Sequence, residues 1–313
     1  MTQMLSRTAS NLYWLARYAE RADATGRLLM FGRRLSMLPD GISADDWRSV
    51  LRVAGCERFV DRGAEVSEAD AVAVLLLDPD NPSSIRASLD RARANGRAVR
   101  TALTAEMWEA LNDGWRKLER LNTERAVRDL PQLIDWTRGY VARFRGAVST
   151  SMLRNEGYHF LRIGGAVERA GLTLRLLDTN YHLLLPEGEV MGGHRDHYRW
   201  NALLQTVSGL RAYYHVYRDN VRPWHITDFL LINRIFPRSL AYSVDQLRYH
   251  LDRLAQTVSG EQEADRSVAR LDTRLQRMRA GAIFQYGLHE FVLESLAELD
   301  RTSRDIGEAY HFV

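Results

Sequence analysis

NLYWLARYAERADATGRLLM, residues 11–30, carries a clear helical pattern. Its small and apolar residues recur at spacings of three and four, which places them on one stripe of an α-helix. These residues are Leu12, Leu15, Ala16, Ala19, Ala22, Gly26 and Leu29. Ser6 is suited to cap the start of this helix, and Pro39-Asp40-Gly41 is suited to stop it. The sequence therefore predicts one long helix between these two signals.

Helical periodicity continues through the rest of the chain. It predicts further helices over residues 45–62, 83–100, 107–125, 131–150, 156–185, 198–217, 238–258, 263–279 and 283–306. Two short apolar runs, Val72–Leu77 and Phe229–Ile232, fit either a strand or a buried helix, and we favour helix ends or short extended links. Alternation with period two is nearly absent, so the predicted fold class is all-α.

The sequence also repeats itself in three places that follow one another in the same order. The matched segments are Glu20-Arg21-Ala22 with Glu168-Arg169-Ala170, Trp47 with Trp200, and residues 75–90 with residues 230–245. This pattern predicts a tandem duplication, with one repeat over residues 1–150 and a second over residues 151–313. The two helical halves would pack into one globular body about an internal pseudo-two-fold axis, as the protomers of a homodimer do.

Composition excludes several classes of protein. The chain has 313 residues, of which 45% are hydrophobic and 27% charged, which suits a folded core rather than a disordered tail. No apolar run approaches the roughly 18 residues that cross a bilayer, so no membrane partner is expected. The N-terminus lacks the apolar stretch of a secretory signal, which predicts a cytoplasmic protein. Acidic and basic residues are interspersed, with a net charge of +3, so no nucleic-acid partner is expected.

The residue inventory also argues against a bound cofactor. Cys56 is the only cysteine, which excludes an internal disulfide and a site that needs several thiolates. No glycine-rich phosphate loop of the P-loop or dinucleotide type occurs. We therefore expect no cofactor and assign no metal ligand.

The repeated Glu-Arg pair is the candidate functional motif. Neighbouring residues on a helix point about 100° apart, so Glu20 and Arg21 cannot readily pair with each other. At a partly buried seam each charged group needs a partner from a second helix, because burying an unpaired charge costs several kcal/mol. One interpretation is that Glu20 and Glu168 take arginines across the two halves and fix their register. The other is that these residues line a cleft and bind a zwitterionic or peptide-like ligand. The candidate ligand-binding residues are Glu20, Arg21, Arg27, Glu168, Arg169 and Arg175.

Two enzymatic alternatives stay open at this point, although a binding protein is favoured over an enzyme. In the first, Glu20 and Glu168 act as general acid and base, which requires a strongly shifted pKa in an accessible pocket. In the second, the Glu-x-x-His pairs Glu156/His159 and Glu308/His311 contribute to a di-iron carboxylate site in a helical bundle.

Tyr13-Trp14-Leu15-Ala16-Arg17-Tyr18-Ala19-Glu20-Arg21-Ala22 resembles the signature of the bacterial alpha-E family. The resemblance extends through nearly the whole chain, including Ala92–Arg97, Glu106–Asn112 and Phe236–Leu240. It implies an all-helical domain with a Glu-Arg motif, typically duplicated in tandem. The resemblance also implies that the protein is found together with ATP-grasp ligases, transglutaminase-like proteins and N-terminal-nucleophile peptidases. The expected function is therefore an accessory or binding component of an ATP-grasp-linked peptide synthesis or modification system.

Overall fold

The computed structural model describes residues 4, 6–37, 44–113, 116–119, 121–184, 194–256, 263–279, 281–283 and 287–312. Within these ranges every regular element is helical, which confirms the all-α prediction. The longer helices are α1 (Ser6–Ser36), α2 (Ala44–Val53), α4 (Ile85–Ala98), α5 (Ala105–Asn112), α8 (Leu130–Ser151), α9 (Glu156–Leu184), α10 (His194–Thr206), α11 (Leu210–Tyr217), α13 (Leu240–Ala255), α14 (Glu263–Arg277) and α16 (Leu288–Ala309). The shorter ones are η1 (Glu57–Phe59), α3 (Glu68–Val72), η2 (Ala73–Leu77), η3 (Arg100–Ala102), α6 (Arg116–Glu119), α7 (Thr123–Arg128), α12 (Pro223–Thr227) and η4 (Asp228–Ile232).

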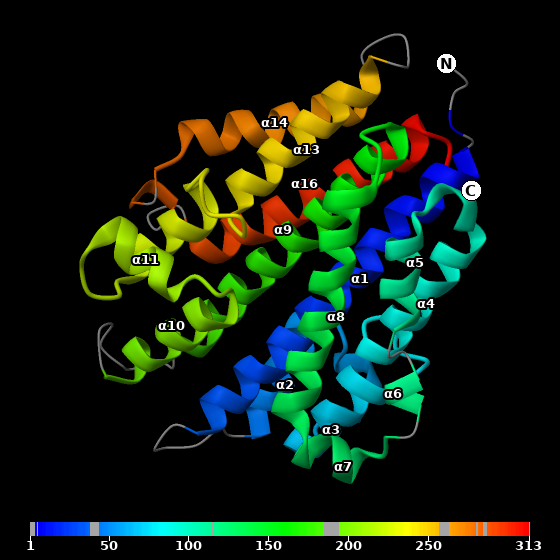
Figure 1. The fold of residues 1–313 in the computed structure, drawn as a ribbon. Coiled ribbons are helices and arrows are strands. Elements are labelled where there is room, and N and C mark those ends of the chain that lie inside the picture. Colours follow the sequence, from blue (N-terminus) through cyan, green and yellow to red (C-terminus); the bar gives the residue numbers. More distant parts are fainter. Residues whose placement is uncertain are drawn as a thin grey trace.

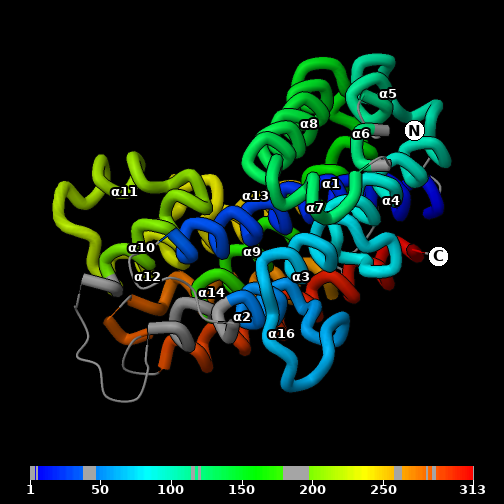
Figure 2. Tube along the Cα trace, turned by 90° about the horizontal axis from the view of Figure 1, so that it is seen from below, coloured from blue at the N-terminus to red at the C-terminus, as the bar shows by residue number. Residues whose placement is uncertain are grey.

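The two long helices α1 and α9 pack against each other through the middle of the molecule (Figure 1). On one side, α4 and α8 pack against α1, and α5 packs against α8. On the other side, α13 and α16 pack against α9, and α14 packs on both of these helices. In Figure 2, α10 and α11 lie at one end of the body and α5 at the opposite end. The Glu-Arg motifs therefore lie on the two central helices.

Helix α1 is buried on nearly every side because neighbours surround it. Its fully buried apolar residues include Leu12, Leu15 and Leu29, which are predicted stripe residues. Its buried set also contains Glu20, Asp23 and Arg27, which is unusual for a central helix, because charged side chains rarely enter a core unless they are paired. The predicted start at Ser6 is confirmed, whereas Pro39-Asp40-Gly41 lies outside the described residues.

Helix α9 approaches the backbone of α1 closely at Gly164. A methyl group added to this glycine would lie 2.3 Å from the backbone oxygen of Tyr13 and 3.4 Å from the Cβ of Ala16. Gly165 lies beside Glu20 on the same seam, whereas Gly26 faces Ile134 and Ile85 instead. Small residues thus allow the α1 backbone to pack closely against one turn of α9.

We expect Gly164→Ala to destabilise the protein by about 1–3 kcal/mol, because the added methyl group meets backbone that cannot rotate away. Chemical denaturation followed by circular dichroism measures the change. Gly146→Ala is the matched control, since a methyl group on this α8 glycine meets nothing within 4 Å. Helix propensity then makes the control more stable by about 0.5–1 kcal/mol. Equal effects of the two substitutions would contradict the packing described here.

The two ambiguous apolar runs form π-helical turns, η2 and η4, rather than strands or extended links. In each, an N–H donates to the carbonyl five residues earlier, Asp78 to Ala73 and Asn233 to Asp228, both at 2.9 Å. The chain then becomes extended at Asp78 and at Asn233.

A serine after each turn caps the next helix. Ser84 Oγ donates to the Asp78 carbonyl and accepts from the Ala87 N–H, and Ser239 does the same with Asn233 and Tyr242. The two segments that match in sequence therefore adopt the same local structure.

Three predicted helices are shorter or broken. The helix expected over 45–62 ends at Val53, because Gly55 takes a positive φ of 68° and the Cys56 N–H donates back to Leu51. The helix expected over 198–217 breaks where Ser208 takes a φ of 57° and the Gly209 N–H donates back to Leu204. The helix expected over 107–125 breaks after Asn112, where Asp113 is extended.

The ends of α2 and α10 therefore share one stop motif, and Trp47 and Trp200 occupy corresponding places on these two helices. The division into repeats over 1–150 and 151–313, and the pseudo-two-fold axis between them, remain predictions.

Candidate functional site

The carboxylate of the α9 motif, Glu168, pairs with two arginines from α1. Glu168 is 5% exposed, and its carboxylate accepts from Arg21 in bidentate fashion, with Nε to Oε1 at 2.6 Å and Nη2 to Oε2 at 3.0 Å. Arg17 Nε donates to the same Oε2 at 2.9 Å. Two guanidinium groups thus saturate one buried carboxylate, which is the arrangement that makes such an ion pair tolerable in a core.

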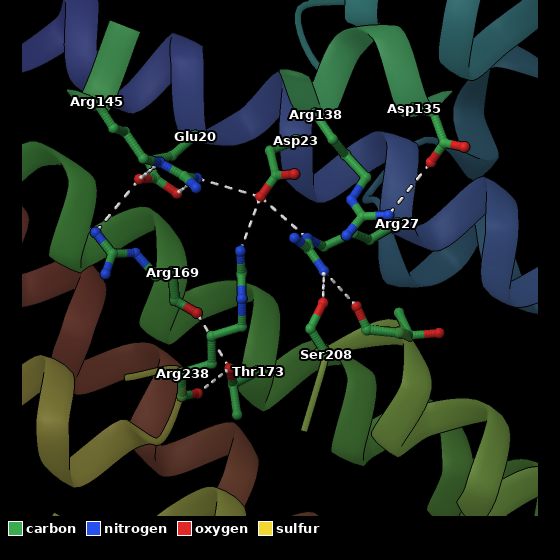
Figure 3. Close-up of polar contacts among 11 residues, drawn as sticks. Glu20, Asp23, Arg27, Asp135, Arg138, Arg145, Arg169, Thr173, Ser208 and Arg238 are labelled. Carbon is green, nitrogen blue, oxygen red and sulfur yellow. Dashed lines mark hydrogen bonds and ion pairs between the residues drawn. The ribbon is translucent and has the colours of Figure 1, made fainter. Parts of the chain in front are cut away.

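The carboxylate of the α1 motif, Glu20, pairs in turn with arginines of α9 and α8. Arg169 of α9 donates through Nη2 to Glu20 Oε1 at 3.3 Å. Arg145 of α8 donates to both oxygens of Glu20, with Nε to Oε1 at 2.7 Å. The two motifs therefore exchange arginines, since Arg21 pairs with Glu168. Arg169 pairs with Glu20 in return, as Figure 3 shows.

Both glutamates are held ionised. Burial alone would raise the pKa of Glu168, but Arg21 and Arg17 outweigh it and lower the pKa to about 2. Burial likewise opposes ionisation of Glu20, while Arg169 and Arg145 bring its pKa below the usual value. A general acid or base works best with a pKa near the working pH, so these two carboxylates are suited to act as fixed counter-ions.

Asp23 forms a second cluster that sequence reasoning missed. Its Oδ2 atom accepts from Arg27 Nε at 3.0 Å, Arg238 Nη2 at 3.0 Å and Arg145 Nη2 at 3.2 Å (Figure 3). Burial disfavours the charge on Asp23, but these arginines lower its pKa well below the usual range. Burial and the neighbouring Arg27 lower the pKa of Arg238 to about 10. The i, i+4 spacing of Asp23 and Arg27 was the one signal available in the sequence.

Arginine outnumbers acid in the two clusters. Among the described residues, six arginines contact the three carboxylates of Glu20, Asp23 and Glu168. These arginines are Arg17, Arg21, Arg27, Arg145, Arg169 and Arg238. Because the fixed charge is positive on balance, this seam favours a further anionic group at its margin.

A cavity of about 260 Å³ borders the Glu168 pair. Its lining includes Arg21, Thr25, Ser83, Glu168 and Arg175. A second cavity of about 190 Å³ shares Arg175 with the first and extends towards Asp178. Beside Glu20 and Arg169, by contrast, the space is about 40 Å³, enough for a water molecule and little more.

The structure thus places four predicted ligand-binding residues in two ion-pair clusters between α1 and α9, because Arg21 pairs with Glu168 and Arg169 pairs with Glu20. Arg27 joins the Glu20 cluster through Asp23, which shares Arg145 with Glu20. Arg175 lines both cavities. All six predicted residues are therefore at the α1–α9 seam or its margin.

The Glu-x-x-His pairs do not meet in a shared site. Glu156 accepts from the Met4 N–H at 2.8 Å, and His159 Nδ1 lies 2.9 Å from Nδ1 of buried His250. Burial lowers the pKa of His159 and brings that of His250 to about 3, so both rings are neutral at pH 7. In the described part of the chain, no three His, Cys, Asp or Glu side chains are grouped so that they could hold a metal ion.

The chain belongs to the Alpha-E family, whose description reads "a predicted alpha-helical domain with a conserved ER motif" and whose model matches residues 4–311. Two similar relatives are the uncharacterized proteins Mb2597 of Mycobacterium bovis and Rv2567 of Mycobacterium tuberculosis. Each is 26% identical over 339 residues, which cover 96% of this chain and 36% of the relative. The chain therefore spans about a third of the length of these relatives. No solved structure matches it.

The family description names an ER motif, and Glu20-Arg21 and Glu168-Arg169 are the Glu-Arg pairs of the two central helices α1 and α9. No described helix is both long enough and apolar enough to span a lipid bilayer.

Proposed function

We propose that this chain is an accessory, binding component of an ATP-grasp-linked peptide synthesis or modification system. In this proposal it acts in the cytoplasm and holds a peptide-like substrate, or a segment of a partner protein, beside the paired helices α1 and α9. Its partner is an ATP-grasp ligase or a transglutaminase-like protein. Membership of the Alpha-E family supports the proposal, because the family resemblance implies such proteins as its companions.

The observation that carries the binding role is the cavity at the Glu168–Arg21 pair. It places two guanidinium groups, from Arg21 and Arg175, at a space of about 260 Å³ between the central helices and the end of α2. Arginine suits recognition of carboxylates, because its planar group donates two parallel hydrogen bonds. A peptide-like ligand brings a carboxylate of this kind together with amide groups that the lining hydroxyl groups can contact.

Electrostatics favour binding over catalysis by the paired glutamates. Glu20 and Glu168 each accept from two arginines, and both have lowered pKa values. Acid–base catalysis would instead require one of them to exchange protons near neutral pH. We therefore propose that the two motifs fix the shape of the seam, and that the ligand lies beside it.

The decisive experiment measures ATP consumption by the ATP-grasp ligase of the same organism with a peptide acceptor, with and without the purified full-length chain. We expect the chain to form a complex with the ligase and to raise its peptide-dependent turnover. The full-length chain with Arg175→Gln should still fold and bind the ligase, but should raise turnover less. If neither complex formation nor a change in turnover is observed, the proposed function is wrong.

A further inference from the structure

Three arginines gather where α1 and α8 meet the end of α10. Arg27 Nη1 donates to the Thr206 carbonyl at 2.7 Å and to Ser208 Oγ at 3.0 Å. Arg34, seven residues further along α1, donates to Thr206 Oγ1 at 3.4 Å. The side chain of Arg138 reaches from α8 towards Arg27 (Figure 3). The two α1 arginines therefore contact one turn at the end of α10, and Arg138 approaches them from α8.

Arg34 is the member of this cluster that has no acid of its own. It is partly buried, and its hydrogen bond in the described part of the chain goes to the neutral hydroxyl group of Thr206. Burial, followed by the charges of Arg138 and Arg27, lowers the pKa of the Arg34 guanidinium, whereas Asp135 raises it. A partly buried cation that faces two others is unfavourable unless an anion joins them.

The acids at this place do not neutralise the three arginines. Asp23 accepts from Arg27, but it shares its charge with two further arginines of its own cluster. Asp135 pairs with Arg138 at 3.3 Å, but it is 77% exposed, so solvent weakens this pair. Three arginines therefore face Asp135 as their remaining acid, which leaves an excess of about two positive charges.

The cluster also presents hydrogen-bond donors that lack acceptors. Arg138 Nε is shielded from solvent and has no hydrogen-bond partner among the described residues. The exposed Ser208 accepts from Arg27 through Oγ, and no acceptor for its own O–H lies within the described ranges. Ser208 takes a left-handed φ of 57° at the stop of α10, which sets the position of this hydroxyl group. One ligand with several acceptor oxygens would satisfy these donors together.

We propose that this cluster binds the phosphoryl group of a small ligand, either inorganic phosphate or a phosphate monoester. A phosphoryl group carries about two negative charges near neutral pH and three acceptor oxygens, which match the excess charge and the set of donors. A monocarboxylate supplies a single charge and two oxygens. In this arrangement Arg34 and Arg138 donate to the phosphoryl oxygens through their planar groups, and Ser208 donates its hydroxyl hydrogen.

This site is separate from the one in the proposed function. None of Arg27, Arg34 and Arg138 lines the cavity at the Glu168–Arg21 pair. The phosphoryl site therefore does not depend on whether that cavity holds a peptide-like ligand.

The test is a calorimetric titration of the full chain with inorganic phosphate, with glycerol 3-phosphate and with acetate, at pH 8 and constant ionic strength. We expect the better of the two phosphate compounds to bind at least about tenfold more tightly than acetate. Tighter binding of inorganic phosphate would assign the free ion as the ligand, and tighter binding of glycerol 3-phosphate would assign a monoester. Equal binding of acetate and the phosphate compounds, or binding of neither phosphate compound, would overturn the proposal.

The pH dependence of binding tests the charge of the ligand. A phosphate monoester loses its second negative charge below about pH 6, whereas the arginines stay protonated. The Kd for glycerol 3-phosphate should therefore rise about tenfold between pH 8 and pH 5, because about a tenth of the monoester remains dianionic at pH 5. An affinity that stays constant over this range would contradict recognition of a dianion.

Substitutions locate the site. Arg34→Gln and Arg138→Gln should each weaken binding of the preferred phosphate compound by about tenfold or more. Both variants should fold and melt at or above the wild-type temperature without ligand, because each removes a repelling charge and leaves no buried carboxylate unpaired. Arg128→Gln removes the same charge from a 67% exposed position on α7 and should leave binding unchanged. If Arg34→Gln and Arg138→Gln bind as tightly as the wild type, the proposed site is wrong.

Discussion

Asp23→Ala is expected to destabilise the protein by about 3–5 kcal/mol, a magnitude typical of removing one partner from a buried ion pair. Asp23 is 2% exposed and accepts from Arg27, Arg145 and Arg238 through one oxygen. Without this carboxylate, three guanidinium groups remain close together in a poorly solvated place, and of the three only Arg145 also pairs with Glu20 among the described residues. The midpoint of urea denaturation, followed by circular dichroism, measures the loss.

Asp135→Ala serves as the control for this substitution. Asp135 also pairs with an arginine, Arg138, but it is 77% exposed, so its removal should cost less than about 1 kcal/mol. Asp23→Gly combined with Arg238→Ser removes the buried carboxylate together with one of its arginine partners and should cost less than the two single changes added together. A loss for Asp23→Ala no larger than that for Asp135→Ala would show that the arginine cluster needs no counter-ion.

Glu168→Gln is expected to cost about 3 kcal/mol at neutral pH, because Arg17 and Arg21 would then face a neutral amide. The effect should depend on pH. The pKa of Glu168 is about 2 in the folded protein against an ordinary value of 4.5, so the unfolded chain takes up the proton first as the pH falls. The stability supplied by the carboxylate is therefore complete above about pH 4.5 and is lost as the pH falls towards 2.

The unfolding free energies of wild type and Glu168→Gln should consequently differ most above pH 5 and converge in acid. Chemical denaturation at a series of pH values measures this difference. Glu263→Gln is the control, because Glu263 is 54% exposed in its pairs with Arg266 and Arg270, and its replacement should leave stability nearly unchanged at every pH. A difference that persists unchanged to pH 2 would mean that the Glu168 carboxylate is not the source of the effect.

The central helices could be predicted from the sequence because their signals are local. Periodic small and apolar residues define α1, and the helical stretch that begins at Glu156 defines α9. The need of each Glu-Arg motif for partners on another helix also follows from helix geometry alone. Arg21 pairs with Glu168 and Arg169 pairs with Glu20, which agrees with the interpretation in which each motif glutamate takes an arginine from the other motif.

The remaining partners could not be found in this way, because they depend on tertiary structure. Arg145 lies 125 residues after Glu20, and Arg238 lies 215 residues after Asp23. Nothing in the local sequence around either arginine distinguishes it from the many surface arginines of this chain. The π-helical turns are ambiguous for a different reason, since a buried run of four to six apolar residues has no exposed face to reveal its period.

The exchange of arginines has a consequence for dissecting the molecule. Glu168 receives both of its neutralising groups, Arg17 and Arg21, from the first helix of the chain. A fragment that begins after α8 would therefore bury the Glu168 carboxylate without these two arginines, even if its hydrophobic contacts stayed intact. Such a fragment lacks the ion-pair partners of Glu168, so truncation studies should add α1 as a separate peptide or co-express it.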